Sequence, residues 1–368
     1  MHRRAVILTG AAALAACAAP APEPPAVPAT PPSTPPPPPP PPPPHNPAFL
    51  RMPEPVLGSS GDARFDAWRE RVMQTWGEGW RPYLVRLFAD LRPIRVEPEP
   101  APANPLADWP LQVVTPERVA EGRRVAREPW LQAIAVSHKV PAAVLAAVWG
   151  AETDFGRRRG EYDLLAFWAT RAAVGDYFRD DQFGDAAKLV VAGQVPRAAL
   201  RAFADGSTGQ VRWFPRQHAE MAKDGDGDGL ADIWRSPRDA LTSVAGRLAG
   251  GWEPASWVVQ VRMPTGDDPR TLRFLEAVRR EAQLSPDYFQ RADGRPWDLE
   301  DRRGSGRLVR PLGDAGPAFL LLRNFAPLQY LAGDYRGRFP GEDRSLPWGF
   351  AVGLLANAIA GEFDAPPF

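Results

Sequence analysis

An unbroken run of ten prolines at positions 35–44 is the feature that most limits what this chain can fold into. Proline fixes φ and lacks a backbone N–H, so the run adopts polyproline II, rises about 3.1 Å per residue and spans about 30 Å. More proline, alanine, serine and threonine flank the run, and residues 18–60 cannot form a hydrophobic core. We therefore predict a disordered proline-rich stalk over residues 17–60 and a folded domain over residues 61–368.

The first sixteen residues have the pattern of a secretory signal peptide. A basic start (HRR) precedes the apolar run AVILTGAAALAA, which is too short to span a bilayer as a folded anchor. The run ends in LAAC (14–17), which resembles the lipobox of bacterial lipoproteins, where the cysteine carries lipid after cleavage. The alternative is a coincidental match in an alanine-rich leader.

Cys17 is the only cysteine of the chain, so no intramolecular disulfide can form. The lipobox resemblance implies a periplasmic protein whose membrane contact is the lipidated Cys17. Ala18 follows it in place of the aspartate linked to inner-membrane retention. We therefore expect anchoring to the outer membrane of a Gram-negative bacterium.

Composition and periodicity favour a mainly helical domain without a polyanionic partner. The 44 basic and 44 acidic residues cancel, which argues against nucleic acid, and four scattered histidines argue against a histidine metal site. Apolar periodicity predicts helices over 65–76, 83–88, 115–138, 164–175, 185–196 and 237–249, with an extended connector over 93–114. Short strands are expected at 257–264, 306–311 and 318–322 near the C-terminus.

One predicted helix, PAAVLAAVWGAETDFG at 141–156, carries the strongest candidate for catalysis. Pro141 suits the first helical position, and Gly156 suits a helix end. Continuing the apolar face one turn past Trp149 reaches Glu152. Desolvation there would raise the pKa of Glu152, as a general acid requires. The alternative is a solvated carboxylate, or one paired with an arginine of the turn 157–159.

Several strings of the chain resemble the lytic murein transglycosylase B family. They are GAETDFGR (150–157), WFPRQHAEMAKDGDGDGLADIW (213–234), RNFAPLQY (323–330) and FAVGLLANAIAG (350–361). The resemblance implies a lysozyme-like (goose-type-like) catalytic domain that acts on peptidoglycan glycan strands with no required cofactor. It also implies that Glu152 is the single acid/base, and that the products end in 1,6-anhydro-N-acetylmuramic acid.

The substrate groove implied by the resemblance is altered in this chain. Gly206 and Gly209 keep part of the family string, and Tyr330 matches its C-terminal aromatic residue. Phe203, Arg212 and Leu331 replace the family's serine, glutamine and asparagine. The resemblance assigns Gly206, Ser207, Gly209, Arg212 and Tyr330 to substrate binding. A catalytically degenerate peptidoglycan-binding lipoprotein is the alternative, and a water-using muramidase on the same fold is a third interpretation.

The loop DGDGDG at 224–229 begins like a calcium-binding EF-hand, with oxygen donors at positions 1, 3 and 5. Arg235 stands where the EF-hand has its bidentate glutamate. The candidate ligands for a structural Ca²⁺ are Asp224, Asp226, Asp228, Asp232 and Asp239. A plain acidic turn, with Asp239 completing a capping box with Ser236, is the other interpretation.

Overall fold

The computed structural model describes residues 47–51, 53–100, 102–175, 177–266, 268–279, 284–333 and 345–363. These residues all belong to one of the two compact units of the chain, Pro39–Phe368. The predicted signal peptide, Cys17 and the ten-proline run lie outside them. Within the described part, no single helix is both long and apolar enough to cross a membrane, although the bent pair α6 and α7 passes that test jointly.

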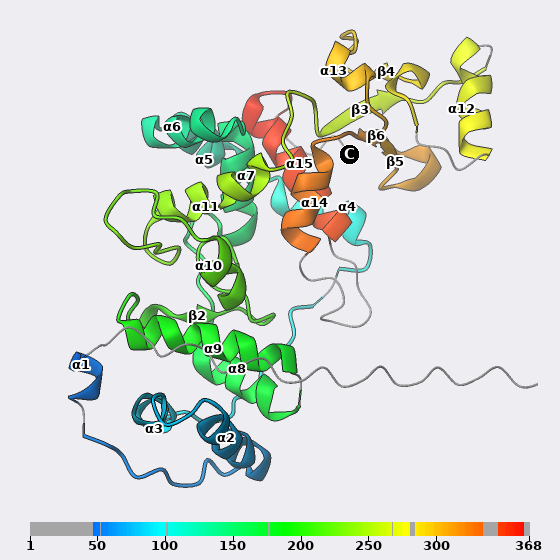
Figure 1. Ribbon diagram of the computed structural model, residues 1–368. Coiled ribbons are helices and arrows are strands. Elements are labelled where there is room, and N and C mark those ends of the chain that lie inside the picture. Colours follow the sequence, from blue (N-terminus) through cyan, green and yellow to red (C-terminus); the bar gives the residue numbers. More distant parts are fainter. Residues whose placement is uncertain are drawn as a thin grey trace, which may run out of the picture. The chain divides into compact units, whose positions relative to one another are not determined.

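Fifteen α-helices dominate the described residues, and most of the helices of the first half begin at or next to a proline (Figure 1). Proline suits a first turn because its missing N–H would have no partner there. These helices are α1 (Pro47–Leu50), α2 (Ala63–Thr75), α3 (Arg81–Phe88), α4 (Pro105–Val113), α5 (Pro116–Ala126), α6 (Pro129–His138), α7 (Ala142–Thr153), α8 (Leu164–Ala173) and α9 (Tyr177–Ala192).

The second half adds further helices and a small sheet, which confirms the predicted small β elements near the C-terminus. Its helices are α10 (Pro215–Met221), α11 (Pro237–Ala249), α12 (Pro269–Arg279), α13 (Leu299–Arg302), α14 (Phe325–Gly333) and α15 (Ser345–Ala360). Its strands are β3 (Val258–Arg262), β4 (Gln290–Arg291), β5 (Arg307–Val309) and β6 (Ala318–Leu321). They form an antiparallel sheet in the order β4-β3-β6-β5, with Val258 opposite Leu321.

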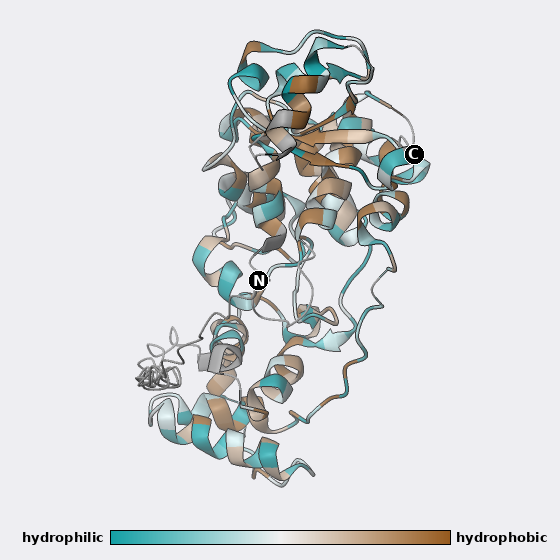
Figure 2. Cartoon of the chain, turned by 90° about the vertical axis from the view of Figure 1, so that its right-hand side faces the viewer, coloured by the Kyte–Doolittle hydropathy of each residue, from teal (hydrophilic) through white to brown (hydrophobic). Residues whose placement is uncertain are grey.

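The main hydrophobic core surrounds α7, which is buried on nearly every side because its residues are almost all apolar. The helix α15, also apolar all round, packs against α4, α5, α7 and α14. The other helices have one apolar side, and hydrophobic (brown) and hydrophilic (teal) residues alternate along them in Figure 2. A second, smaller core lies at the four-stranded sheet and includes Val259, Phe289 and Leu320.

Packing extends upstream of the predicted domain start. Phe49 stacks on Tyr83 at a ring-centroid distance of 6.0 Å, and Leu50 and Leu57 also contact the main core. The side chain of Asp62 caps α2 by accepting from two backbone N–H groups. Residues just before Asp62 therefore join the core that the sequence assigned to residues 61–368 alone.

Two predictions of secondary structure are wrong. The helix predicted over 115–138 is two helices, because Pro129 disfavours helical φ and ψ at Glu128, whose ψ is 132°. The extended connector predicted over 93–114 contains α4, whose Ala107 and Pro110 are buried. Prolines on both sides hide the helical period there, and packing against α15 stabilises the helix.

Candidate active site

Glu152 lies in the last turn of α7, and the backbone after it turns sharply. Asp154, Phe155 and Gly156 all have positive φ, so α7 ends at Thr153. Gly156 is required there, since a Cβ atom would come within 2.5 Å of Gln210 Oε1. At the other end Pro141 is the N-cap and not the predicted first helical residue, because its ψ of 136° is extended.

The carboxylate of Glu152 is largely withdrawn from water, with 14% of the side chain exposed. Burial raises the pKa of Glu152 to about 8. Arg212 opposes this rise, Asp205 and Glu99 add to it, and Arg158 again opposes it. Glu152 is therefore protonated at neutral pH, as a general acid must be.

The cation nearest to Glu152 in the described residues is not an arginine of the turn 157–159. Arg157 pairs with Glu121 at 3.1 Å and with Asp154 at 3.6 Å, and Arg158 lies 3.9 Å from Glu99. Arg212 Nε instead lies 4.0 Å from Glu152 Oε2. The sequence left open whether Glu152 pairs with an arginine of the turn that follows it. In the structure its nearest arginine is Arg212, sixty positions away in the sequence.

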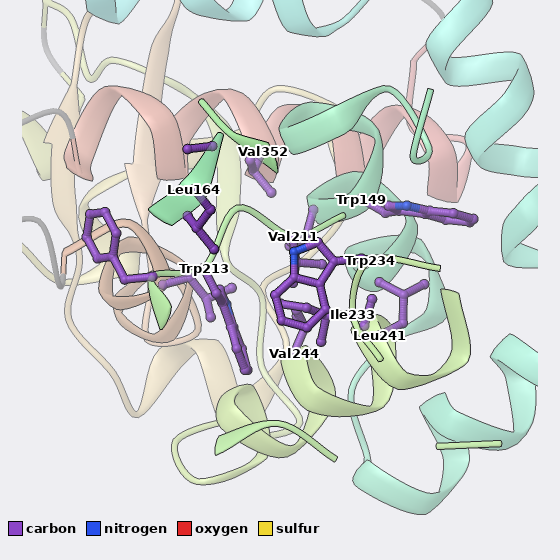
Figure 3. Close-up of a cluster of buried hydrophobic side chains, with 14 of the residues drawn as sticks. Trp149, Leu164, Val211, Trp213, Ile233, Trp234, Leu241, Val244 and Val352 are labelled. Atoms are coloured by element: carbon purple, nitrogen blue, oxygen red, sulfur yellow. The ribbon is translucent and has the colours of Figure 1, made fainter. Parts of the chain in front are cut away.

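Arg212 belongs to a loop that returns along the end of α7. The loop follows β2 (Arg201–Ala202), which pairs with β1 (Tyr162–Asp163). Val211 and Trp213, on either side of Arg212, are buried in the main core, as the close-up in Figure 3 shows. The two backbone hydrogen bonds between Thr208 and Trp213 close the loop. The packing of these two neighbours fixes the position of the Arg212 backbone, from which its side chain extends.

The structure explains why glycine is retained at two positions of the groove string. A Cβ atom on Gly206 would lie 2.5 Å from the rings of Phe167 and Trp168, and one on Gly209 would lie 2.8 Å from Ile233. Both have positive φ. Ser207 is fully buried, and the substrate contact predicted for it stays a prediction. Its hydroxyl donates to Asp205 and accepts from Arg212.

Gln210 connects this loop to α7 and was missed by the sequence analysis. Its side-chain oxygen accepts from Trp149 Nε1 at 3.1 Å, and its backbone oxygen accepts from Thr153 Oγ1 at 2.6 Å. Asp205 and Glu99 were missed as well. No sequence pattern marks them, because each acts near Glu152 only through a contact between distant segments.

Two of the remaining groove predictions, Tyr330 and Leu331, lie on α14, and the third, Phe203, directly follows β2. Tyr330 is 60% exposed, and the guanidinium of Arg247 lies 4.6 Å from the centre of its ring. Leu331 is buried in the main core, so its side chain is a core residue and not an altered groove residue. Phe203 is also buried, and it contacts Arg212 directly.

Four of the five predicted calcium ligands gather where the loop between α10 and α11 meets the first turn of α11, which supplies Asp239. One carboxylate oxygen from each lies within 4.8 Å of the others, in Asp224, Asp226, Asp228 and Asp239. Oxygen donors in this number and charge suit Ca²⁺. Glycines with positive φ at 227 and 229 let the loop curl around this point.

Asp232 is not part of this group. Its carboxylate accepts from the backbone N–H groups of Trp234 and Arg235, and it pairs with the Arg235 side chain. The predicted capping box is also only half formed: Ser236 caps α11, but the Asp239 carboxylate accepts from Gly225 and other loop N–H groups instead. Asp239 thus organises the loop and does not merely cap its helix.

A cavity of about 490 Å³ lies elsewhere, and its lining includes Lys139, Trp252 and Asp301. Lys139 and Pro141 place it at the beginning of α7, whereas Glu152 is in the last turn. The chemistry described above therefore does not use this cavity.

Comparison with known proteins identifies the class. The family model described as "Transglycosylase SLT domain" matches residues 86–330. No curated protein matches the chain. The structure resembles SltB3 from Pseudomonas aeruginosa in complex with NAG-anhNAM-pentapeptide, with 28% identity, a TM-score of 0.66, and coverage of 82% of this chain and 80% of that one.

Two further structures share the fold. SltB1 from Pseudomonas aeruginosa has 22% identity and a TM-score of 0.60, with coverage of 82% of this chain and 98% of SltB1. The Escherichia coli lytic transglycosylase Slt35, in complex with calcium, has 18% identity and a TM-score of 0.59, with coverage of 82% and 93%.

The chain belongs to the transglycosylase SLT domain family, because the family model covers more than half of its residues. It is an SLT-like lytic transglycosylase, which confirms the resemblance found in the sequence and the mainly α, lysozyme-like fold.

Proposed function

We propose that this lytic transglycosylase cleaves the β-1,4 bond between N-acetylmuramic acid and N-acetylglucosamine in peptidoglycan without water, with Glu152 as its single general acid/base. The observation that carries the proposal is the buried carboxyl group of Glu152, whose pKa of about 8 keeps it protonated at neutral pH. The SLT domain and the ligand of SltB3, which contains anhNAM, support the product.

The reaction begins when Glu152 donates its proton to the glycosidic oxygen. The bond between that oxygen and C1 of the muramic acid breaks, and the substrate's own N-acetyl oxygen stabilises the positive charge that develops at C1. The Glu152 carboxylate then takes the proton of the C6 hydroxyl, and O6 closes onto C1 as the anhydro ring. Glu152 ends protonated, ready for another turnover.

A single acid/base fits the groups around Glu152. A hydrolytic glycosidase of the two-carboxylate type needs a second free carboxylate, either as a nucleophile or to activate water. Asp205 is the acid whose charge raises the pKa of Glu152 most, but one of its oxygens accepts from Ser207 N and Oγ, and the other accepts from Arg212 at 2.9 Å. Its carboxylate is already engaged by the protein.

The alternative is a catalytically degenerate protein that binds peptidoglycan. Phe203 and Arg212 favour it, because they stand where the family has polar residues that contact the glycan. Leu331 no longer supports it, since that side chain is buried in the core. The intact Glu152 environment favours the enzyme.

We also propose a structural Ca²⁺ held by Asp224, Asp226, Asp228 and Asp239. The support is the convergence of these carboxylates and the calcium complex of Slt35, which shares the fold. The two positive charges of the ion would offset half of the negative charge of the four carboxylates, and the ion would stiffen the loop between α10 and α11. That loop contacts the site's own loop, since Trp234 Nε1 donates to Thr208 Oγ1 and Gln210 N donates to Ile233 O.

The domain division and the location follow from the sequence alone and remain proposals. Residues 1–16 would be removed as a signal peptide, and lipid on Cys17 would anchor the chain in the periplasm, at the outer membrane. Of the linker predicted over residues 17–60, the part before Phe49 would form the stalk that carries the domain to the glycan strands, since Phe49, Leu50 and Leu57 pack against the core. Metabolic labelling with a fatty-acid analogue, compared with Cys17→Ala, tests the anchor.

A digest of purified sacculi tests the activity. The detergent-solubilised full-length protein should release anhydro-muropeptides, as mass spectrometry would identify them, whereas Glu152→Gln should release none. Reducing-end products would instead mean hydrolysis. Absence of release, with the protein still sedimenting with sacculi, would exclude the enzyme and support the binding protein.

A further inference from the structure

The two groove positions where this chain departs from its family touch each other. Phe203 and Arg212 lie nine positions apart, and the guanidinium carbon of Arg212 is 4.4 Å from the centre of the Phe203 ring. This is the geometry of a cation–π contact. The two replacements therefore form one unit, and it faces Glu152.

Arg212 is held on all sides by protein groups. Its Nη2 donates to Asp205 Oδ2 at 2.9 Å and to Glu99 Oε2 at 3.4 Å, and its Nε donates to Ser207 Oγ at 3.2 Å. Only 13% of the side chain is exposed. A guanidinium so engaged is a poor receptor for a carboxylate of the substrate, because three of its five N–H donors are already used.

The contact with Glu152 is electrostatic and not a hydrogen bond. The distance of 4.0 Å between Arg212 Nε and Glu152 Oε2 exceeds hydrogen-bond length, and the single Nε hydrogen points to Ser207. The Arg212 backbone, with φ of 50°, adopts a left-handed conformation that is unfavourable for a residue with a Cβ atom. The buried neighbours Val211 and Trp213 hold it there (Figure 3).

We propose that Phe203, Asp205 and Ser207 form a clamp that keeps the Arg212 charge beside Glu152 without letting it form a direct salt bridge. This proposal rests on the proposed role of Glu152 as acid and then base. A direct salt bridge would strip the proton needed for the first step. An Arg212 charge that Asp205 and Glu99 partly offset, 4.0 Å from Glu152, leaves the proton on Glu152 before the reaction. The same charge stabilises the Glu152 carboxylate that forms after the proton is transferred.

Asp205 and Arg212 should therefore act on Glu152 with opposite sign. The charged groups that face Glu152 are Arg212, Asp205, Glu99 and Arg158. Removal of the Arg212 charge leaves Arg158 as the only base that opposes the two acids, and this favours protonated Glu152. Removal of the Asp205 charge leaves Glu99 as the only acid that offsets the two arginines, and this favours the carboxylate. Phe203 and Ser207 are positioning residues, since they act through Arg212.

The test measures kcat/KM on sacculi as a function of pH for full-length variants. The fall of kcat/KM at alkaline pH reports the loss of the Glu152 proton in the free enzyme. Arg212→Gln should move it up by about one pH unit, and Asp205→Asn should move it down by a similar amount. Glu99→Gln, on an exposed carboxylate, should move it down by less. Arg157→Gln, whose partners are Glu121 and Asp154, is the matched arginine control and should not move it.

A ¹³C NMR titration of the Glu152 carboxyl group measures the same shifts of its titration midpoint without depending on activity. The Glu152 signal is assigned by its absence in Glu152→Gln. Opposite shifts for Arg212→Gln and Asp205→Asn support the clamp. Equal shifts, shifts of the same sign, or unchanged titration overturn it. If Asp205→Asn does not fold, Glu99→Gln supplies the opposite sign. A wild-type protein that is inactive but shows opposite titration shifts would refute the proposed function and leave the clamp standing.

Discussion

Acidic side chains gather both at the end of α7 and in the loop between α10 and α11, but their exposure to water and their charge environment differ. At α7 one carboxyl group is buried, and its charge environment is nearly balanced by Arg212, Arg158, Asp205 and Glu99. In the loop four carboxylates converge, three of them exposed. The first arrangement keeps a proton on a carboxyl group, and the second presents negative charge to a cation.

The comparison shows that burial decides the chemistry of an acidic residue more than its type does. The same functional group is a proton donor where desolvation disfavours its charge, and it is an oxygen ligand where water or a metal satisfies it. The four predictions below test this contrast, beginning with the largest expected effect.

Substitution of Glu152 should abolish catalysis while the calcium loop is unaffected. Glu152→Gln removes the only proton donor and should lower kcat/KM by about a thousandfold or more, the range expected for general acid/base catalysis. Release of soluble muropeptides measures the change. Glu117→Gln, an exposed carboxylate at the start of α5, is the control and should keep full activity. Retention of a tenth of the wild-type rate by Glu152→Gln would contradict the assignment.

Calcium should stabilise the protein through the loop. At a hundred times its dissociation constant, an ion bound only by the folded state adds about 2.7 kcal/mol to the free energy of unfolding. Thermal unfolding in millimolar calcium chloride and in EDTA should therefore differ by several degrees, and Asp228→Asn should reduce the difference. Glu152→Gln should keep it. Equal melting temperatures with calcium and with EDTA would identify the loop as a plain acidic turn.

Stability should fall as the pH rises, on account of Glu152. Its pKa rises from 4.5 in the unfolded chain to about 8 in the fold, so the folded state holds a proton that the unfolded state loses. The stabilisation is complete below about pH 4.5 and is lost progressively up to pH 8, at no more than about 1.4 kcal/mol per pH unit.

Denaturant unfolding at several pH values, compared between wild type and Glu152→Gln, isolates this contribution. The difference in stability between the two proteins should change with pH over the window from 4.5 to 8. A constant difference across that window would mean that the carboxyl group is not desolvated.

The smallest expected effect is the change in calcium affinity on substitution of Asp232, which distinguishes an aspartate that accepts backbone hydrogen bonds from one that would bind calcium. Asp232 is engaged by Trp234 and Arg235, so Asp232→Asn should leave calcium affinity within about twofold of wild type. Isothermal titration of both variants with calcium gives the comparison, and Asp228→Asn should bind more weakly. A loss of affinity in Asp232→Asn equal to that in Asp228→Asn would place Asp232 among the ligands.

Much of the helical architecture could be predicted from local signals. Thr115-Pro116 and Ser236-Pro237 begin helices because a capping hydroxyl and a proline suit a first turn, whatever the rest of the chain does. The strands at 258–262 and 318–321 were visible as short apolar runs. The helix α15 was not assigned, since a helix that is apolar on every side has no period.

Within the candidate site, the residues themselves pointed to Glu152. Its place at the end of an apolar helical face, and the string around it, are properties of consecutive residues. The family resemblance placed Arg212 in the groove, but its position beside Glu152, and those of Asp205 and Glu99, could not be predicted, because they depend on distances between segments far apart in the sequence. Ser207 and Leu331 were assigned to the groove from alignment alone, and the structure places both side chains in buried positions.

The sequence by itself determined where helices begin, which carboxyl group ends an apolar helical face, and which aspartates can meet near one loop, because each of these depends on residues close together in the chain. The tertiary structure alone decided that Arg212 stacks on Phe203 and stands beside Glu152. It also decided that Asp232 leaves the calcium group. The physical reason is that burial and charge balance arise when separate segments pack, and the local pattern of a chain does not contain those distances.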